Sequence, residues 1–194
     1  MDSGITRHWT RPAALAGQWQ IRYTDSAMDI HVRELNQGEG LVWRDLRLRA
    51  LLDSPDAFGM TYEVESLRPD NDWHQRIDER VADSWSTSLI AEINDKPGGI
   101  AGCGFDVEDQ SLCGLYAMWV APEFRGAGVG RALVTYALKW MKSRGARTAQ
   151  LSVTERNDAA FSLYTSSGFK DTEVREPLRE GSAKQVIVMR RTLG

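Results

Sequence analysis

The fold of this chain is decided by the stretch Val120-Ala-Pro-Glu-Phe-Arg-Gly-Ala-Gly-Val-Gly-Arg-Ala-Leu133. The apolar run of residues 115–120 predicts a buried strand, and the helical spacing of apolar residues after the loop predicts a helix over residues 127–144. Such a junction exposes backbone N–H groups at a helix N-terminus, where the partial positive charge suits an anion such as phosphate. Its glycines stand at alternate positions, Gly126, Gly128 and Gly130.

Three kinds of phosphate-binding loop are candidates for this junction. A dinucleotide-binding turn requires Gly-x-Gly-x-x-Gly directly after its strand, but Arg131 stands where the third glycine belongs. A P-loop requires Gly-Lys-Ser/Thr at its end, and the sequence has no such residues there. The third candidate is the acyl-CoA loop of the GNAT superfamily of N-acetyltransferases, with the pattern Arg/Gln-x-x-Gly-x-Gly/Ala after Val-x-Pro. The chain resembles that pattern at Val120, Pro122, Arg125, Gly128 and Gly130.

A second motif supports the same resemblance. Residues 157–169 resemble the other GNAT signature, N-x-x-A-x-x-L-Y-x-x-x-G-F, at every specified position. Each residue also has an ordinary structural explanation: Asn157 could be no more than a helix cap, and Tyr164 could be a core aromatic. Together the two motifs identify residues 29–191 as similar to the superfamily. The matching residues of the second motif are Asn157, Ala160, Leu163, Tyr164, Gly168 and Phe169.

The resemblance implies the GNAT fold, of the α/β (α+β) class. We expect a central twisted sheet of about six or seven strands, mixed but mostly antiparallel, with flanking helices and strands that splay at the acyl-CoA cleft. Residues 44–52 are expected to form a helix with leucines on one face and arginines on the other. Residues 28–194 are expected to form a single GNAT domain, and residues 1–27 an N-terminal extension outside it. The strands are predicted over residues 29–34, 87–93, 100–106, 111–120, 148–154, 169–175 and 185–191.

On the donor side, the resemblance assigns a role to each motif. The loop N–H groups would bind the CoA pyrophosphate, the strand before the loop would pair with the pantetheine amides, and an N–H near Met118 would polarise the thioester carbonyl. Asn157 would hydrogen-bond the pantetheine. Tyr164 would protonate the departing thiolate, because the pKa of a phenol, about 10, exceeds that of a thiol. The expected cofactor-binding residues are Met118, Trp119, Val120, Arg125, Gly126, Ala127, Gly128, Val129, Gly130, Asn157, Ala160 and Tyr164.

The general base is left open by the sequence. The family often places a glutamate on the strand before the glycine loop, whereas residues 111–120 contain no carboxylate. Glu92 is the tentative base, and a water relay through backbone carbonyls is an equal candidate. The other carboxylates considered are Glu63, Glu65 and Asp106.

The acceptor is also open. Phe58, Tyr62 and Tyr116 are expected to wall its site together with Glu63, although the aromatics are explained equally well as core residues. We expect a small-molecule amine or a peptide N-terminus, with polyamines, aminoglycosides and protein lysines as alternatives.

Composition limits the remaining function classes. The net charge of -3 gives no support to nucleic-acid binding, and the apolar runs are shorter than the roughly 20 residues of a membrane span, so neither partner is expected. The 2 cysteines and 3 scattered histidines indicate neither a disulfide framework nor a metal site. Composition thus favours a cytoplasmic protein without a metal, and the resemblance implies acetyl-CoA as its co-substrate; homodimerisation is left open.

The leading hypothesis is an acetyl-CoA-dependent N-acetyltransferase in which a primary amine attacks the thioester directly within a ternary complex. The alternative is a catalytically silent acyl-CoA-binding domain with a sensing or regulatory role. The missing strand carboxylate favours this alternative, whereas the presence of Tyr164 favours catalysis. An enzyme with a longer acyl-CoA or an alcohol acceptor is the third possibility.

Overall fold

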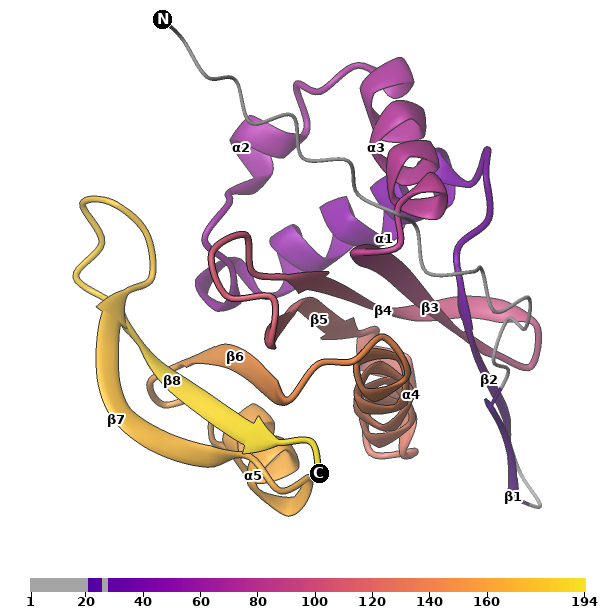
Figure 1. Cartoon of the computed structure of the whole chain (residues 1–194). Coiled ribbons are helices and arrows are strands. Elements are labelled where there is room, and N and C mark those ends of the chain that lie inside the picture. Colours follow the sequence, from indigo (N-terminus) through magenta and orange to yellow (C-terminus); the bar gives the residue numbers. More distant parts are fainter. Residues whose placement is uncertain (1–20, 26–27) are drawn as a thin grey trace, which may run out of the picture.

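A sheet of eight strands forms the centre of the computed structural model, which describes residues 21–25 and 28–194 (Figure 1). The strand order is β1-β2-β3-β4-β5-β6-β8-β7. Neighbouring strands are antiparallel except for β5 and β6, which are parallel because a helix connects them as a crossover. The strands are β1 (Ile21–Asp25), β2 (Met28–Glu34), β3 (Ser86–Ile93), β4 (Lys96–Phe105), β5 (Leu112–Val120), β6 (Thr148–Thr154), β7 (Lys170–Pro177) and β8 (Gln185–Thr192).

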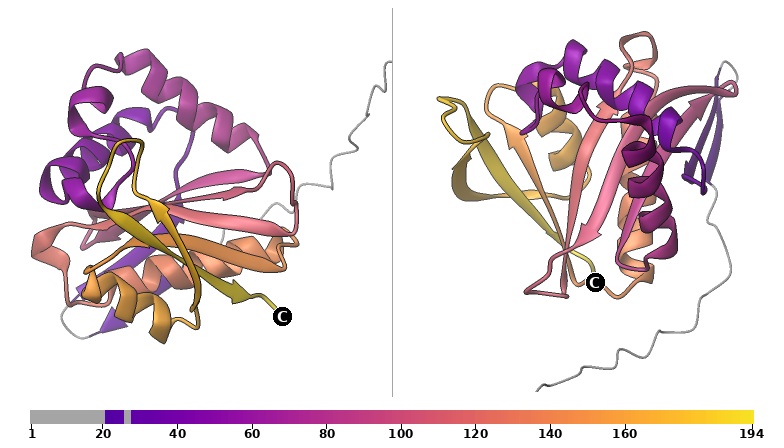
Figure 2. Two further views of the ribbon diagram at one scale, coloured as in Figure 1. Left: turned by 90° about the vertical axis from the view of Figure 1, so that its left-hand side faces the viewer. Right: turned by 90° about the horizontal axis from the view of Figure 1, so that it is seen from above.

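Helices cover both faces of the sheet. The first three helices lie on one face of β3, β4 and β5, and the fourth lies on the other face (Figures 1 and 2). The last helix contacts the fourth and follows β6 in the chain. The helices are α1 (Gly40–Asp53), α2 (Tyr62–Glu65), α3 (Asp70–Ala82), α4 (Val129–Ser143) and α5 (Asp158–Ser166), with short 3-10 turns at η1 (Pro55–Ala57) and η2 (Pro122–Phe124).

The seven strands expected from the sequence are all present, and the mostly antiparallel arrangement is confirmed. The eighth strand is β1, which comes from the segment assigned to the N-terminal extension and pairs antiparallel with β2. Residues 1–20 and 26–27 lie outside the described residues, so the domain boundary at residue 28 stays a prediction.

Two apolar cores, one on each face, hold the helices to the sheet. The core under α4 contains Leu133, Tyr136 and Trp140, each at most 2% exposed. The core under α1 and α3 contains Trp43 and Trp73. Burial of one large apolar side chain contributes about 1.5–3 kcal/mol. The two cores therefore fix both helix layers against the strands from which the candidate site is built.

The two cysteines are buried free thiols on neighbouring strands. Cys103 lies opposite Leu115 and Cys113 lies opposite Phe105, so the thiols are offset along the strands. Burial raises the pKa of both thiols, which keeps them neutral and suits them to packing. Within the described residues, no helix combines the length and the apolar character needed to cross a membrane.

Candidate functional site

The glycine-rich loop forms a backbone arch at the N-terminus of α4. Gly126 and Gly128 have left-handed backbone conformations, with φ of +78° and +86°, and a Cβ on either would meet no atom within 4 Å. Within the described part of the chain, the N–H groups of Gly126, Ala127 and Gly128 donate no hydrogen bond. The Ala132 N–H donates to the Gly128 carbonyl at 3.0 Å and so starts the helix. The unpaired donors and the helix dipole thus meet in open space, which suits a pyrophosphate.

The Arg125 side chain supports the loop from behind. Its Nε donates to the Val120 carbonyl at 3.0 Å, and its guanidinium forms an ion pair with Asp53 at the end of α1. Asp53 also accepts a hydrogen bond from Trp119 Nε1 at 2.9 Å. Burial opposes the ionisation of Asp53, but hydrogen bonds led by the one from Trp119 outweigh it and lower the pKa. The loop is therefore tied to α1 through a carboxylate.

The unpaired N–H groups of the arch begin one residue later than the sequence pattern suggests. The Arg125 N–H donates to the Pro122 carbonyl at 3.3 Å, so it is already occupied, and Gly126 supplies the first unpaired donor. Val129 is 1% exposed and anchors the first turn of α4 in the core. Of the expected loop residues, some therefore present backbone donors and others hold the arch in place.

β5 and β6 pair only at their beginnings. Leu112–Gly114 pairs with Thr148–Gln150, and no later residue of β5 is paired with β6. β5 stays paired with β4 up to Val120, but the register slips near Ala117, whose φ of +53° is rare for a residue with a side chain. Such a bulge re-aims backbone groups. The expected splay is confirmed, and Met118 lies on its β5 side.

Gly130 marks the point where the two sequence motifs meet. A Cβ on this residue would lie 3.1 Å from Leu163 of α5 and 3.6 Å from the methyl group of Met118 on β5. A side chain here would contact Met118 and would require Leu163 to shift slightly. The glycine loop, the splayed end of β5 and α5 therefore converge on one place.

Asn157 precedes α5, and Tyr164 lies in the last turn of that helix. The Asn157 Oδ1 accepts a hydrogen bond from the Ala160 N–H at 3.2 Å, so this side chain caps the helix. Tyr164 is 6% exposed and its ring centre lies 6.1 Å from that of Phe169. Burial raises the pKa of Tyr164, so the hydroxyl keeps its proton at neutral pH. That hydroxyl makes no hydrogen bond to any residue that the structure describes, which leaves its proton available.

Glu92 is held in an ion-pair network between β2 and β3. Arg33 donates to its carboxylate at 2.8 and 3.2 Å, and His31 Nδ1 lies 3.3 Å away. Arg33 also pairs with Glu39 at 2.7 Å. Burial opposes the ionisation of Glu92, but hydrogen bonds from Arg33 outweigh it and lower the pKa, which weakens this carboxylate as a proton acceptor. Since β4 also separates β3 from β5, the geometry disfavours Glu92 as the general base.

The other carboxylates considered as bases are also engaged elsewhere. Asp106 accepts two backbone N–H groups in the turn between β4 and β5. Glu65 is 4% exposed and pairs with Arg68 at 3.3 Å. Glu63 is exposed on α2, where hydrogen bonds from its own backbone and from Thr61 lower its pKa. These engagements favour a water relay over any of the three carboxylates.

The residues expected to wall the acceptor site come from the segment after α1, from α2 and from β5, and the tip of the β7–β8 hairpin lies close to the first of these. Phe58 is 6% exposed and belongs to the core under α1. Arg179 donates to its carbonyl at 3.1 Å, so the hairpin tip contacts this segment. Tyr116 is 38% exposed and donates to the Cys103 carbonyl at 3.2 Å, and Tyr62 is half-buried at the start of α2. The expected aromatic residues thus combine core and surface roles.

Two features of this region were missed by the sequence reasoning. Asp53 ends α1, and nothing in the sequence links it to Arg125, which lies 72 positions away. Arg47 was placed on a polar face, yet it is only 8% exposed. Its position four residues from both Trp43 and Leu51 is the signal that places it on the buried stripe.

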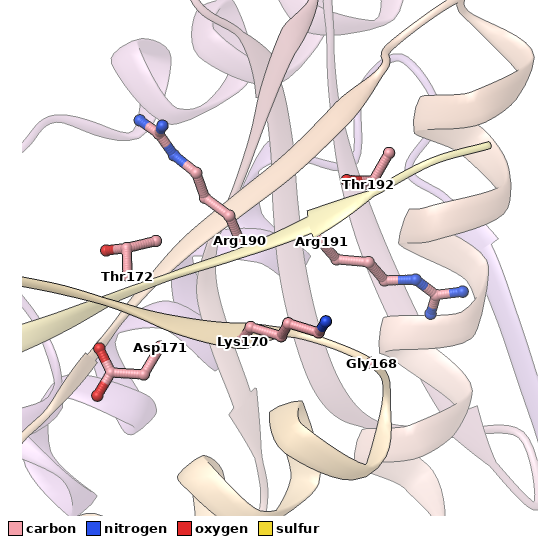
Figure 3. Close-up of a pocket in the computed structure, with 7 residues that line it drawn as sticks. All are labelled: Gly168, Lys170, Asp171, Thr172, Arg190, Arg191 and Thr192. Atoms are coloured by element: carbon pink, nitrogen blue, oxygen red, sulfur yellow. The ribbon is translucent and has the colours of Figure 1, made fainter.

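A separate hollow of about 410 Å³ lies beside the paired strands β7 and β8 (Figure 3). Arg190 and Arg191 point away from each other in it, Arg190 toward Gln150 and Arg191 toward the Ser167 carbonyl (Figure 3). Its polar groups therefore do not converge on one ligand. Across the described ranges, no group of three His, Cys, Asp or Glu residues could hold a metal ion.

Comparisons with known proteins identify the family of this chain. Residues 48–169 match the model of the acetyltransferase (GNAT) family. An uncharacterized N-acetyltransferase of Methanocaldococcus jannaschii is 34% identical over 90 residues, which cover 44% of this chain and 40% of that relative. The chain thus aligns with about two fifths of the length of this curated relative.

Solved structures share the fold. A GNAT-family acetyltransferase from Streptococcus pneumoniae superposes with a TM-score of 0.75 at 22% identity, over 85% of this chain and 99% of that one. The structure of yncA from Salmonella typhimurium, described with its cofactor acetyl-CoA, gives 0.71 at 18% identity, over 85% and 94% of the two chains. The family model covers most of the 194 residues and both sequence motifs, and this chain therefore belongs to the GNAT acetyltransferase family.

Proposed function

We propose that this chain transfers an acetyl group from acetyl-CoA to the primary amine of a small molecule or a peptide N-terminus. The observation that carries the proposal is the arch of unpaired N–H groups at Gly126, Ala127 and Gly128, which faces open space at the N-terminus of α4. The residues present fit the CoA pyrophosphate, because the donors need no rearrangement to receive an anion. Acetyl-CoA, when bound, supplies an activated acetyl thioester.

The unpaired end of β5 is the proposed partner of the pantetheine. Backbone groups from Met118 to Val120 lie where β5 has left β6, so they are placed to pair with amides as an added strand would. The bulge at Ala117 re-aims the backbone near Met118, and this N–H is the proposed donor to the thioester carbonyl. Polarisation of that carbonyl favours direct attack by a neutral amine in a ternary complex.

Tyr164 is the proposed acid for the departing thiolate. Its hydroxyl stays protonated because burial raises its pKa, and the helix that carries it, α5, approaches the loop where Leu163 lies near Gly130. The attacking amine must lose a proton, and a water relay is the proposed route because Glu92 is bound to Arg33. The general base is thus the least constrained part of this mechanism.

A thiol-release assay tests the proposed function. Protein and acetyl-CoA are mixed with a panel of amines, and free CoA thiol and acetylated amine are measured together. Amine-dependent release of thiol with matching product supports acetyl transfer. Tight binding of acetyl-CoA without turnover across the panel would instead favour the sensing role. Competition between acetyl-CoA and longer acyl-CoA molecules then defines the donor.

A further inference from the structure

Four arginines gather where α1, α2 and α3 face β5. The guanidinium of Arg47 lies 4.6 Å from the centre of the Phe58 ring, and that of Arg80 lies 5.6 Å from the centre of the Tyr116 ring. Both aromatic residues belong to the acceptor side, so the arginines stand beside the space assigned to the acceptor. We call them the arginine cluster: Arg47, Arg68, Arg76 and Arg80.

Arg47 is buried without a carboxylate to pair with its charge, although its guanidinium lies over the Phe58 ring. It is 8% exposed, its Nη1 has no hydrogen-bond partner, and no carboxylate lies within ion-pair distance among the residues that the structure describes. Burial lowers the pKa of Arg47, which reflects the cost of the charge in this place. A buried charge without a partner is strongly unfavourable, and a fold that keeps one calls for an explanation.

The cluster carries more positive charge than its surroundings neutralise. Glu65 is the one carboxylate within ion-pair distance of it in the described ranges, at 3.3 Å from Arg68 and 3.7 Å from Arg76. Glu79 and Asp83 stand at its outer edge, where they accept hydrogen bonds from neighbouring residues of α3 and β3. Glu65 therefore neutralises guanidinium groups of this chain and does not attract a cationic substrate.

The strand register connects the cluster with the reaction point. Arg80 donates at 2.8 Å to Ser88, which lies in one cross-strand row with Gly102 and Tyr116. A hollow of about 300 Å³ opens beside this row; it is lined by Arg76, Arg80 and Ser86 and, at its outer edge, by Glu79 and Asp83. Met118 follows Tyr116 by two residues, about 7 Å further along the strand. An anion held by the cluster would thus lie one short molecule away from the proposed thioester position.

We propose that the acceptor carries an anionic group, a carboxylate or a phosphate, which the arginine cluster binds while the amine reaches the thioester beside Met118. This inference rests on the proposed function, because it names the acceptor class of that reaction. Guanidinium groups present paired donors that match carboxylate and phosphate oxygens. Polycationic acceptors such as polyamines and aminoglycosides are disfavoured, since like charges would meet in the site.

Matched acceptor pairs test this proposal. The thiol-release assay compares glycine, β-alanine and 4-aminobutyrate with their primary amides, and phosphoethanolamine with ethanolamine, with rates corrected for the fraction of neutral amine. Each pair is measured with the unchanged protein, with Arg47→Met, and with Arg44→Met as the control on the same helix. Arg44 suits as a control because it already pairs with Asp45 and Asp70. Arg76→Met replaces Arg47→Met if the latter does not fold.

We expect the anionic member of at least one pair to exceed its neutral partner in kcat/KM by about tenfold or more, the value of one charged hydrogen bond. Arg47→Met should bring this ratio close to one and leave Tm unchanged or higher, because it removes a buried charge that has no ion-pair partner. Arg44→Met should keep the ratio. The ratio also identifies the source of the anion, since carboxylate and phosphate pairs are measured separately.

A ratio near one in the unchanged protein, or a ratio that Arg47→Met leaves intact, would overturn the proposal while acetyl transfer stands. If no amine releases thiol, the proposed function fails, and calorimetry with inorganic phosphate and with acetate on the acetyl-CoA-saturated protein decides the anion site alone. Binding that Arg47→Met abolishes would support the site. Failure of both anions to bind would overturn it.

Discussion

Replacement of Gly128 by glutamate is expected to abolish CoA binding at a small cost in stability. With φ of +86° and no atom within 4 Å of a Cβ, the new side chain enters open space without colliding with protein. The left-handed conformation costs a residue with a side chain about 1–2 kcal/mol. In a domain of this size that cost lowers Tm by about 2–8 °C. The fold should therefore persist.

The effect on binding should be much larger. A carboxylate about 6 Å from a phosphate charge repels it by about 3 kcal/mol at an effective dielectric constant near 20. Each N–H contact with the phosphate that the side chain displaces removes about another 1.5–3 kcal/mol. The sum, about 4–6 kcal/mol, raises the Kd of CoA by about a thousandfold or more.

Gly145→Glu is the matched control for this variant. Gly145 follows the other end of α4, with φ of +90° and, again, no atom within 4 Å of a Cβ. The control therefore carries the same backbone strain and the same new charge without approaching the loop. Isothermal titration calorimetry with CoA and thermal unfolding without ligand are measured for both variants. If the Kd of Gly128→Glu stays within about threefold of the unchanged protein, less than 1 kcal/mol, the loop is not the pyrophosphate site.

Further predictions concern the acid, the tentative base and the thiols. Tyr164→Phe should lower kcat by about tenfold to a hundredfold with little change in the KM of acetyl-CoA; the loss is moderate because thiolates leave readily. If the chemical step limits the rate and kcat is unchanged, Tyr164 is not the acid. Glu92→Gln should keep kcat/KM but lower the free energy of unfolding by about 1–2 kcal/mol, because charged hydrogen bonds to Arg33 are lost. Loss of turnover at unchanged stability would instead indicate that Glu92 is the general base. The free energy of unfolding should fall between about pH 8 and pH 10 by about 1–2 kcal/mol per thiol, because the folded-state pKa of Cys103 is raised and that of Cys113 rises to about 12, so ionisation near pH 8.5 favours the unfolded chain. Denaturant unfolding at several pH values measures this fall. In the double variant with alanine at both cysteine positions, the free energy of unfolding should depend less on pH. An equal dependence on pH in that variant would contradict the prediction.

The positions of the strands along the chain and the two motifs of the expected donor side could be read from the sequence because their signals are local. The glycines at Gly126 and Gly128 and the motif from Asn157 to Phe169 are short patterns whose spacing alone implies a loop and a helix. The apolar run before the loop likewise predicted β5 within a few residues. Where local structure depends on neighbours in sequence, residue types and spacing were sufficient to predict the loop, the helix and the strand.

The acceptor side could not be read in the same way because it depends on contacts between distant segments. Glu92 looked available in the sequence, and only its pairing with Arg33 across two strands makes it a weak base. Glu65 was considered as a possible base, yet the arginines of α2–α3 already neutralise it. The burial of Arg47 followed a helical stripe that was visible but was assigned to the wrong face. Charge balance in a pocket is a tertiary property, so residue types alone do not determine it.

The most direct test of acetyl transfer at this site is simultaneous measurement of CoA thiol and acetylated amine, with the unchanged protein, Gly128→Glu and Gly145→Glu side by side. We predict one acetylated amine per thiol released by the unchanged protein and by Gly145→Glu, with no turnover by Gly128→Glu at the same acetyl-CoA concentration. Turnover by Gly128→Glu equal to that of the control, or thiol release without an acetylated amine, would contradict it.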